Sequence, residues 1–277
     1  MTIIVSTVSQ HGITVVGDRA VSRRSGDDDL TVLDSGADKV FYSDAANIAF
    51  ACWGNTDFGG TPYSDWIRGI VLSAIEPGMS LLAASEMLAD QINQRLAPIA
   101  ESRRGWSSLR RGVHVSGYVD SLPCIYHVHT GAPEEGHHPL RVYRDFPDVH
   151  GGGADTHQQN LARGKRAQVF NGFHELFGLV GDAFGDLRDR LETEFDVRIP
   201  APTLRGQLEL DRALIRFAAG LLRAGDRAPQ VSLDVTDVAF NASGRIVVGE
   251  LASGLPPLSG AVSSPTASVW RNDHTDV

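Results

Sequence analysis

The chain lacks several features that define protein classes. Its 277 residues include only two cysteines, Cys52 and Cys124, which excludes a disulfide framework and suits a reducing compartment. No run approaches the roughly 18 apolar residues of a membrane-spanning helix. The opening segment MTIIVSTVSQHG has neither the basic leader nor the long apolar stretch of a signal peptide. We therefore expect a cytoplasmic protein with no membrane partner.

Positive charge is also scarce. The chain has 25 Lys and Arg against 34 Asp and Glu, a formal net charge of -9. Nucleic-acid binders usually present a basic face, and the pairs Arg23–Arg24, Arg103–Arg104 and Arg110–Arg111 fit solvated loops better than a phosphate track. We expect no nucleic-acid partner. With 42% hydrophobic and 21% charged residues, the chain is typical of a globular protein that buries a core.

Four short segments rich in apolar and β-branched residues open the chain. They cover residues 3–8, 13–16, 39–42 and 48–53, and each predicts a strand. The first two are separated by a turn at His11 and Gly12, so we expect them to form a hairpin.

Helices and further strands follow in separate groups. Helices are predicted over 61–75, from Ser80 to about 96, over most of 154–191 and over 209–222; strands are predicted over 113–119, 123–129, 140–143, 231–240 and 245–251. Grouping of this kind indicates an α+β fold rather than βαβ alternation. We expect one domain over residues 1–255, with a helical elaboration around 163–202 and a disordered tail over 256–277.

The N-terminus carries the candidate chemistry. A threonine at a mature N-terminus can supply a nucleophilic hydroxyl and, in its free amine, a base whose ordinary pKa is near 8. Thr2 follows Met1, and initiator methionine is readily removed before a small residue. Asp18 ends the second predicted strand, and Lys39 opens the third. A lysine ammonium near the amine would lower its pKa, and Gly54, which closes the fourth strand, lets a carbonyl approach a backbone N–H.

The same positions carry a resemblance to a known family. The matching segments are T-I-I-V-S-T-V at 2–8, V-V-G-D-R at 15–19, K-V-F at 39–41 and I-A-F-A-C-W-G at 48–54. Here the chain resembles the proteasome β-subunits, which are N-terminal-nucleophile (Ntn) hydrolases, and is particularly similar to the bacterial proteasome-like, HslV-type peptidase subunit. The resemblance implies a four-layer αββα sandwich of two antiparallel sheets flanked by helices.

The resemblance also implies roles for individual residues. Thr2 would be the nucleophile and Lys39 its charged neighbour. Asp18 would orient the lysine, and the Gly54 N–H would form the oxyanion hole. A second aspartate of the family corresponds more weakly to Asp226, in the segment G-D-R-A at 225–228.

One further family motif meets a departure. The family has a Ser-Gly-Gly-like turn before a helix, whose serine lies near the amine of the nucleophile. In this chain the sequence that aligns with it is H-G-G-G-A at 150–154. The alignment places Gly151, or His150 if the register shifts by one, where the family has serine.

The implied function is a threonine-type amide hydrolase, a peptidase that acts on peptide or protein substrates through an acyl-enzyme. The family also implies a homo-oligomer of rings or stacked rings and raises an ATP-dependent unfoldase as a partner. Two alternatives stay open. One is a catalytically inactive scaffold subunit of a proteasome-like assembly, and the other is a small-molecule amidase or acylase.

Two other patterns raise different kinds of site. His127 and His129 share a strand face, so with His114 or the pair His137–His138 they offer a metal-site alternative, although no Cys/His spacing is typical of one. The glycines at 151–153 before a helix offer an anion-site alternative, but the Lys-Ser/Thr of a P-loop does not follow them. We predict no metal and no cofactor.

Overall fold

The computed structural model describes residues 2–25, 29–34, 36–54, 57–58, 61–102, 109, 111–130, 138–172, 174–196, 199, 203–224 and 231–245. All of them belong to one compact unit, Met1–Val247. Only the first residue of the strand predicted over 245–251 is described, and the predicted tail lies outside the described residues. The extent of the domain to residue 255 therefore stays a prediction.

One five-stranded sheet, sheet 1, contains both ends of the described chain. Its order is β12-β1-β2-β13-β14, and all neighbours are antiparallel. The strands are β1 (Ile3–Ser9), β2 (Gly12–Asp18), β12 (Ala167–Gly172), β13 (Val235–Asn241) and β14 (Gly244–Arg245). The predicted hairpin of β1 and β2 is confirmed.

A second five-stranded sheet, sheet 2, has the order β11-β10-β9-β6-β5 and is also antiparallel. Its strands are β5 (Val40–Ser43), β6 (Ile48–Gly54), β9 (Arg111–Val119), β10 (Leu122–His129) and β11 (Arg141–Phe146). Two short hairpins pair β3 (Val21–Ser25) with β4 (Asp29–Asp34) and β7 (Asp57–Phe58) with β8 (Thr61–Pro62).

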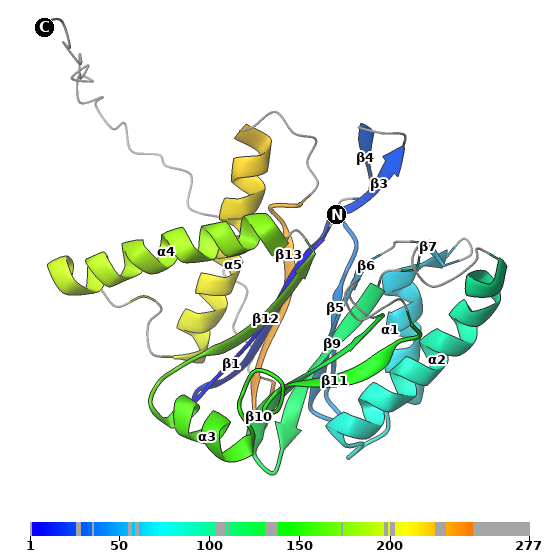
Figure 1. Ribbon diagram of the computed structural model, residues 1–277, viewed down its shortest axis with the longest axis horizontal. Coiled ribbons are helices and arrows are strands. Elements are labelled where there is room, and N and C mark those ends of the chain that lie inside the picture. Colours follow the sequence, from blue (N-terminus) through cyan, green and yellow to red (C-terminus); the bar gives the residue numbers. More distant parts are fainter. Residues whose placement is uncertain are drawn as a thin grey trace, which may run out of the picture. The chain divides into compact units, whose positions relative to one another are not determined.

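Helices cover the outer faces of both sheets. On the side of sheet 2 lie α1 (Tyr63–Ala74) and α2 (Leu81–Ser102), and on the side of sheet 1 lie α4 (His174–Phe195) and α5 (Leu204–Ala224) (Figure 1). α3 (Ala154–Ala162) lies at the opposite end of β1 from the chain's N-terminus (Figure 1). The expected α+β class and αββα layering are confirmed. Within the described part of the chain, no helix has the length and apolarity needed to cross a membrane.

The core between the sheets explains the apolar first strands. Ile4, Val8, Ile13 and Val15 of sheet 1 pack in one cluster with residues of sheet 2 such as Ala51. Alternate residues of β1 face the other way, toward the helices on the outer face of sheet 1. Every residue of β1 and β2 is therefore buried, because sheet 2 covers one face and helices cover the other.

Sequence analysis did not predict strand β12. It lies inside the segment expected to be mostly helical and pairs with β1 along its whole length. Each of its six residues is only half-buried, and Gln168 and Asn171 interrupt its apolar pattern. An edge strand of this kind gives a weak alternation signal beside the strong helical periodicity of α4.

Candidate active site

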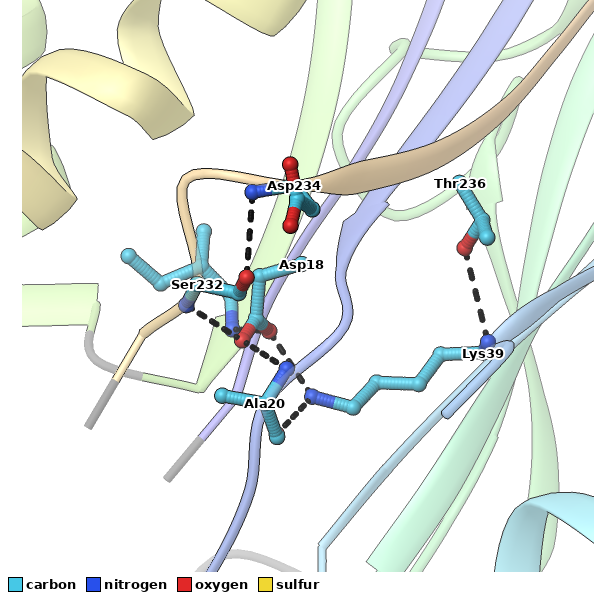
Figure 2. Close-up of polar contacts among 7 residues, drawn as sticks. Asp18, Ala20, Lys39, Ser232, Asp234 and Thr236 are labelled. Atoms are coloured by element: carbon cyan, nitrogen blue, oxygen red, sulfur yellow. Dashed lines mark hydrogen bonds and ion pairs between the residues drawn. The ribbon is translucent and has the colours of Figure 1, made fainter. Parts of the chain in front are cut away.

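A buried carboxylate organises the end of the sandwich where β1 begins, which we call the Thr2 end. Asp18, at the last position of β2, is fully buried. Its Oδ1 accepts hydrogen bonds from Ile3 N at 2.8 Å and Lys39 Nζ at 2.9 Å, and its Oδ2 accepts from Ala20 N at 3.0 Å and Ser232 N at 3.2 Å (Figure 2). One charged and three backbone donors therefore fix both oxygens in place.

Lys39 reaches this carboxylate from the other sheet. It directly precedes β5 in sheet 2 and is 3% exposed. Its ammonium donates to Asp18 and to the carbonyl oxygen of Ala20 (Figure 2), and its own carbonyl accepts from Cys52 N at 3.0 Å. An ammonium has three N–H donors, so these two bonds leave one for a further acceptor.

Gly17 makes this crossing between the sheets possible. A Cβ at Gly17 would lie 3.1 Å from Val40 Cγ2, 3.2 Å from Ile4 Cγ2 and 3.6 Å from Lys39 Cβ. A side chain there would have to displace Val40 or Ile4 by a few tenths of an ångström, close to where the lysine passes from one sheet to the other. The glycine of the V-V-G-D-R segment therefore has a packing reason.

Thr2 lies immediately before β1 and is 6% exposed. Its backbone is held from two sides, because Asp18 binds the N–H of Ile3 and Gly172 of β12 pairs with Ile3. Gly172 has φ +108°, and a Cβ there would lie 1.5 Å from the carbonyl oxygen of Thr2. Only glycine allows this close approach.

Gly54 ends β6 at the same end of the sandwich. In an extended strand, successive N–H groups point to opposite sides. The Cys52 N–H donates to the Lys39 carbonyl, so the Gly54 N–H, two residues further on, points to the Lys39 side of β6. Gly54 has φ +109°, which turns the chain away after the strand. The structure thus brings Asp18, Lys39 and the Thr2 backbone together and places Gly54 at their end of the sandwich.

The alignment of residues 150–154 with the family's serine turn is wrong. β6 ends at Gly54, which pairs with the start of β9, whereas β11 runs the other way and ends at Phe146, far from that end. Gly151 lies in the connection between the end of β11 at Phe146 and the start of α3 at Ala154. A Cβ at Gly151 would lie 2.1 Å from the carbonyl oxygen of Pro147, so even an alanine side chain would not fit without backbone movement.

The strand-to-helix connection that does lie beside Thr2 is at the end of β12. Asn171 and Gly172 pair with Ile4 and Ile3, and α4 begins at His174. The residue next to this glycine is therefore asparagine and not serine. The sequence signal for this connection was a short strand followed by Asn-Gly and a helix.

The connection before β13 supplies a partner that sequence analysis missed. Asp226 lies outside the described residues, so its place is still a prediction. Further along the same connection, Ser232 donates its N–H to Asp18, and its Oγ accepts from Asp234 N at 3.0 Å (Figure 2). Thr236 of β13 lies within 3.5 Å of Lys39 N through its Oγ1. A backbone donor has no side-chain signature, so the Ser232 contact required the fold.

The histidines and Cys52 are the remaining candidates from sequence, and His137 among them lies outside the described residues. Among the described residues, no group of three or more His, Cys, Asp or Glu side chains could hold a metal ion. Cys52 is buried, and its burial raises the pKa of the thiol to about 12. A protonated, enclosed thiol is a poor nucleophile, so Cys52 is a weak candidate.

Comparison with known proteins gives a likeness of fold. No family model and no curated protein matches the chain. The solved structure of the helical assembly of the Anbu complex from Pseudomonas aeruginosa is similar at a TM-score of 0.52 and 12% identity, over 86% of this chain and 81% of that one. Anbu (ancestral beta-subunit) from Yersinia bercovieri is similar at 0.50 and 10%, over the same shares.

These structures correct the family expectation. The assignment to the bacterial proteasome-like, HslV-type Ntn subunits is wrong, because the solved structures found to share the fold are Anbu proteins, a distinct proteasome-like family. At 10–12% identity the likeness shows the fold alone. The chain has a proteasome-like fold of the kind seen in the Anbu ancestral β-subunit.

Proposed function

We propose that this chain is a threonine-type amide hydrolase whose nucleophile is the hydroxyl of Thr2, exposed by removal of Met1. The observation that carries the proposal is the buried Lys39–Asp18 ion pair at the start of β1. Burying two charges costs several kcal/mol per ion, in order of magnitude, so such a pair is weak evidence for stability and better evidence for a site. The same carboxylate holds the residue that follows Thr2.

The choice of lysine supports this interpretation. The chain contains only two lysines, Lys39 and Lys165. All its other Lys or Arg positions are arginine. Lys165 is exposed, so the one buried ammonium among the lysines is at the Thr2 end. A lysine is a compact charge with rotatable donors, whereas a guanidinium is a rigid planar fork. A compact ammonium suits a hydroxyl that must gain and lose a proton.

The proposed reaction has two steps. The Thr2 amine takes the hydroxyl proton as Oγ1 bonds to the substrate carbonyl carbon, and the amine then gives that proton to the leaving nitrogen as the C–N bond breaks. The same amine then takes a proton from water, whose oxygen bonds to the ester carbonyl carbon, and the protonated amine returns the proton to Oγ1 as the bond between Oγ1 and that carbon breaks. The remaining N–H of Lys39 would stabilise the Thr2 oxygen, and the N–H of Gly54 would stabilise the oxyanion.

The substrate class and the assembly belong to the proposal as well. Peptide or protein substrates and self-assembly of the chain agree with the fold, and the structure from Pseudomonas aeruginosa is described as a helical assembly. That assembly favours an open helical arrangement over the closed rings expected from sequence. The comparisons give no support to an unfoldase partner. A cytoplasmic location is part of the same proposal.

A scaffold subunit is the second candidate, and two observations favour it. Thr2 is only 6% exposed, so a substrate would need a rearrangement to reach it. Asn171, at the position beside Thr2 where the expected serine would have lain, is bonded to His114. A scaffold would keep the Lys39–Asp18 pair for folding and would show no reaction at Thr2.

Labelling with a threonine-directed electrophile separates the two candidates. Intact mass first establishes whether Met1 is removed, because a retained methionine blocks the amine. An epoxyketone or a β-lactone should then add one adduct to the wild type and none to Thr2→Ala or Lys39→Ala. Lys165→Ala is the matched control and should label like the wild type. Equal labelling of wild type and Thr2→Ala would contradict the proposal, and no labelling of any form would favour the scaffold.

A further inference from the structure

A pair of buried histidines lies between the two sheets, inward from the Thr2 end. His114 of β9 and His127 of β10 are directly opposite each other in register. Their ring centroids are 4.8 Å apart in an edge-to-face arrangement. His114 is fully buried and His127 is 6% exposed. The mechanism above uses neither of them.

His114 connects sheet 2 to sheet 1. Its Nδ1 lies 3.0 Å from Ser6 Oγ of β1, and its Nε2 lies 2.5 Å from Asn171 Oδ1 of β12. An amide oxygen only accepts, so Nε2 must carry the hydrogen, and Nδ1 of the neutral ring accepts from the Ser6 hydroxyl. The imidazole of His114 therefore holds the last residues of β12 against the central strand β9 of sheet 2.

His127 makes the corresponding contact within sheet 2. Its Nε2 accepts from the indole Nε1–H of Trp53 at 2.9 Å. Its hydrogen is then on Nδ1, which lies 3.6 Å from Asp145 Oδ2. Gly112, opposite Trp53 in the sheet, leaves room for the indole, because a Cβ there would lie 2.8 Å from Trp53 Cε2.

The residues held by these rings adjoin the two halves of the candidate site. Asn171 directly precedes Gly172, which lies against the Thr2 carbonyl. Trp53 directly precedes Gly54, whose N–H is the oxyanion candidate. The two rings touch each other, so one continuous set of contacts runs from the nucleophile half in sheet 1 to the oxyanion half in sheet 2.

We infer that His114 and His127 are positioning residues that set the spacing between Thr2 and the Gly54 N–H. The inference rests on the proposed function of Thr2. Catalytic groups lose on the order of 100-fold in rate when they are misplaced by about 1 Å. Two rings in contact, each bonded to the neighbour of one reacting group, are a direct way to hold such a distance.

The environment of the pair keeps both rings neutral. Burial, with the neighbouring His127, lowers the pKa of His114 to about 3. Burial, with His129 and His150, lowers the pKa of His127 well below its ordinary value. Asp145 of β11 is the acidic group that faces them, and its own burial raises its pKa. The acceptor nitrogen that holds Trp53 is thus available throughout the neutral pH range.

Paired variants test the inference. His127→Phe keeps the ring volume but removes the acceptor for Trp53, and His127→Gln restores an acceptor oxygen. His114→Leu and His114→Gln form the same kind of pair for Asn171. His157 is the matched control, because it is also buried and bonded, to the Pro123 carbonyl, but lies in α3 at the other end. His157→Phe should leave the site unchanged.

The readout is the inactivation of the full chain by a β-lactone, resolved into its rate constant and its apparent binding constant. We expect His127→Phe and His114→Leu to lower the rate constant at least tenfold with little change in the binding constant. The glutamine variants should recover to within about threefold of wild type. His157→Phe should react like wild type, although its melting temperature should fall because the buried Pro123 carbonyl loses its donor.

A second readout does not depend on activity. The indole N–H resonance of Trp53, assigned with Trp53→Phe, should shift in His127→Phe and return toward its wild-type position in His127→Gln. Wild-type rates in His127→Phe and His114→Leu, or an unmoved indole resonance, would overturn the inference while leaving Thr2 as the nucleophile. No labelling of the wild type would instead overturn the proposed function, and the indole resonance would still decide whether the histidine contact exists.

Discussion

Two fully buried carboxylates lie in or against sheet 1, and different kinds of hydrogen-bond donor bind them. Asp18, at the Thr2 end, has a lysine ammonium and three backbone N–H groups around it. Asp211 of α5, on the outer face, accepts from the Thr14 hydroxyl at 2.6 Å and from Gln168 Nε2 at 3.2 Å. Burial raises the pKa of Asp211 to about 6.

The difference agrees with the proposal that Asp18 belongs to a site and that Asp211 makes a packing contact. Hydroxyl and amide donors with no direct ammonium partner hold a carboxyl group that is easily protonated, and this suits the junction of a helix with a sheet. At Asp18, an ammonium and three backbone N–H groups bind the carboxylate beside the end of a strand. We therefore expect substitutions around Asp18 to change both stability and labelling at Thr2. Substitution of Asp211 should change stability alone.

The largest effect is expected from Lys39→Met. It leaves the Asp18 carboxylate buried without its cation, which typically costs about 3–5 kcal/mol of stability. Labelling at Thr2 should be lost. Urea unfolding and electrophile labelling measure the two effects. The double variant Asp18→Asn, Lys39→Met should regain part of the stability but none of the labelling; recovery of labelling would show that the ion pair serves folding alone.

A smaller but still clear effect is expected from Gly172→Ala. The added Cβ would meet the Thr2 carbonyl at a positive φ, so the strand end must move, and we expect a loss of more than about 1 kcal/mol. The control is Gly181→Ala in α4, where a Cβ would meet nothing within 4 Å. That change should stabilise the chain by about 0.5–1 kcal/mol. Equal melting temperatures for the two variants would refute the close approach.

Acid should destabilise the chain through the histidine pair. In the unfolded chain His114 has an ordinary pKa near 6.5, and in the folded chain its pKa is about 3. The unfolded state therefore binds more protons between these values, so stability present above pH 6.5 is lost as pH falls toward 3. His114→Leu should remove part of this slope, on the order of 1–2 kcal/mol at pH 5. Unfolding midpoints at pH 5 and pH 7.5 measure it.

The smallest effect on labelling at Thr2 is expected from Asp211→Asn. Its folded pKa of about 6 exceeds the ordinary value near 3.9, so here the folded state binds more protons and stability falls as pH rises from about 4 to about 6. The variant should lack this slope, which is opposite in sign to that of the histidines. The difference between the wild-type and variant unfolding curves isolates it. Labelling at Thr2 should be unchanged. Loss of labelling in Asp211→Asn would contradict the distinction between Asp211 and Asp18.

Local sequence patterns were sufficient for the architecture at the Thr2 end. Runs of apolar and β-branched residues specify β1, β2 and β6, and Asp18, Lys39 and Gly54 at strand ends indicate one end of the sandwich. The hairpin of β1 and β2 returns Asp18 to the start of β1, and the family resemblance implied that Lys39 lies beside it.

Other parts of the site depend on long-range register. The glycines at 151–153 match the local pattern of the expected serine turn. The sequence around them does not determine at which end of sheet 2 they lie, because that depends on the direction of β11. The Ser232 N–H could come from any residue type. The contact of His114 with Asn171 joins two sheets, and β12, which brings Asn171 there, has the weakest strand pattern of sheet 1. These contacts are set by packing between sheets and not by local periodicity.

The most direct test of the central claim is the location of a covalent adduct. Wild-type protein, with Met1 shown to be absent by intact mass, is treated with a β-lactone, digested and analysed by fragment-ion mass spectrometry. The account predicts one adduct, on the hydroxyl of Thr2. An adduct at any other residue, or an unmodified Thr2 with a free amine, would contradict it.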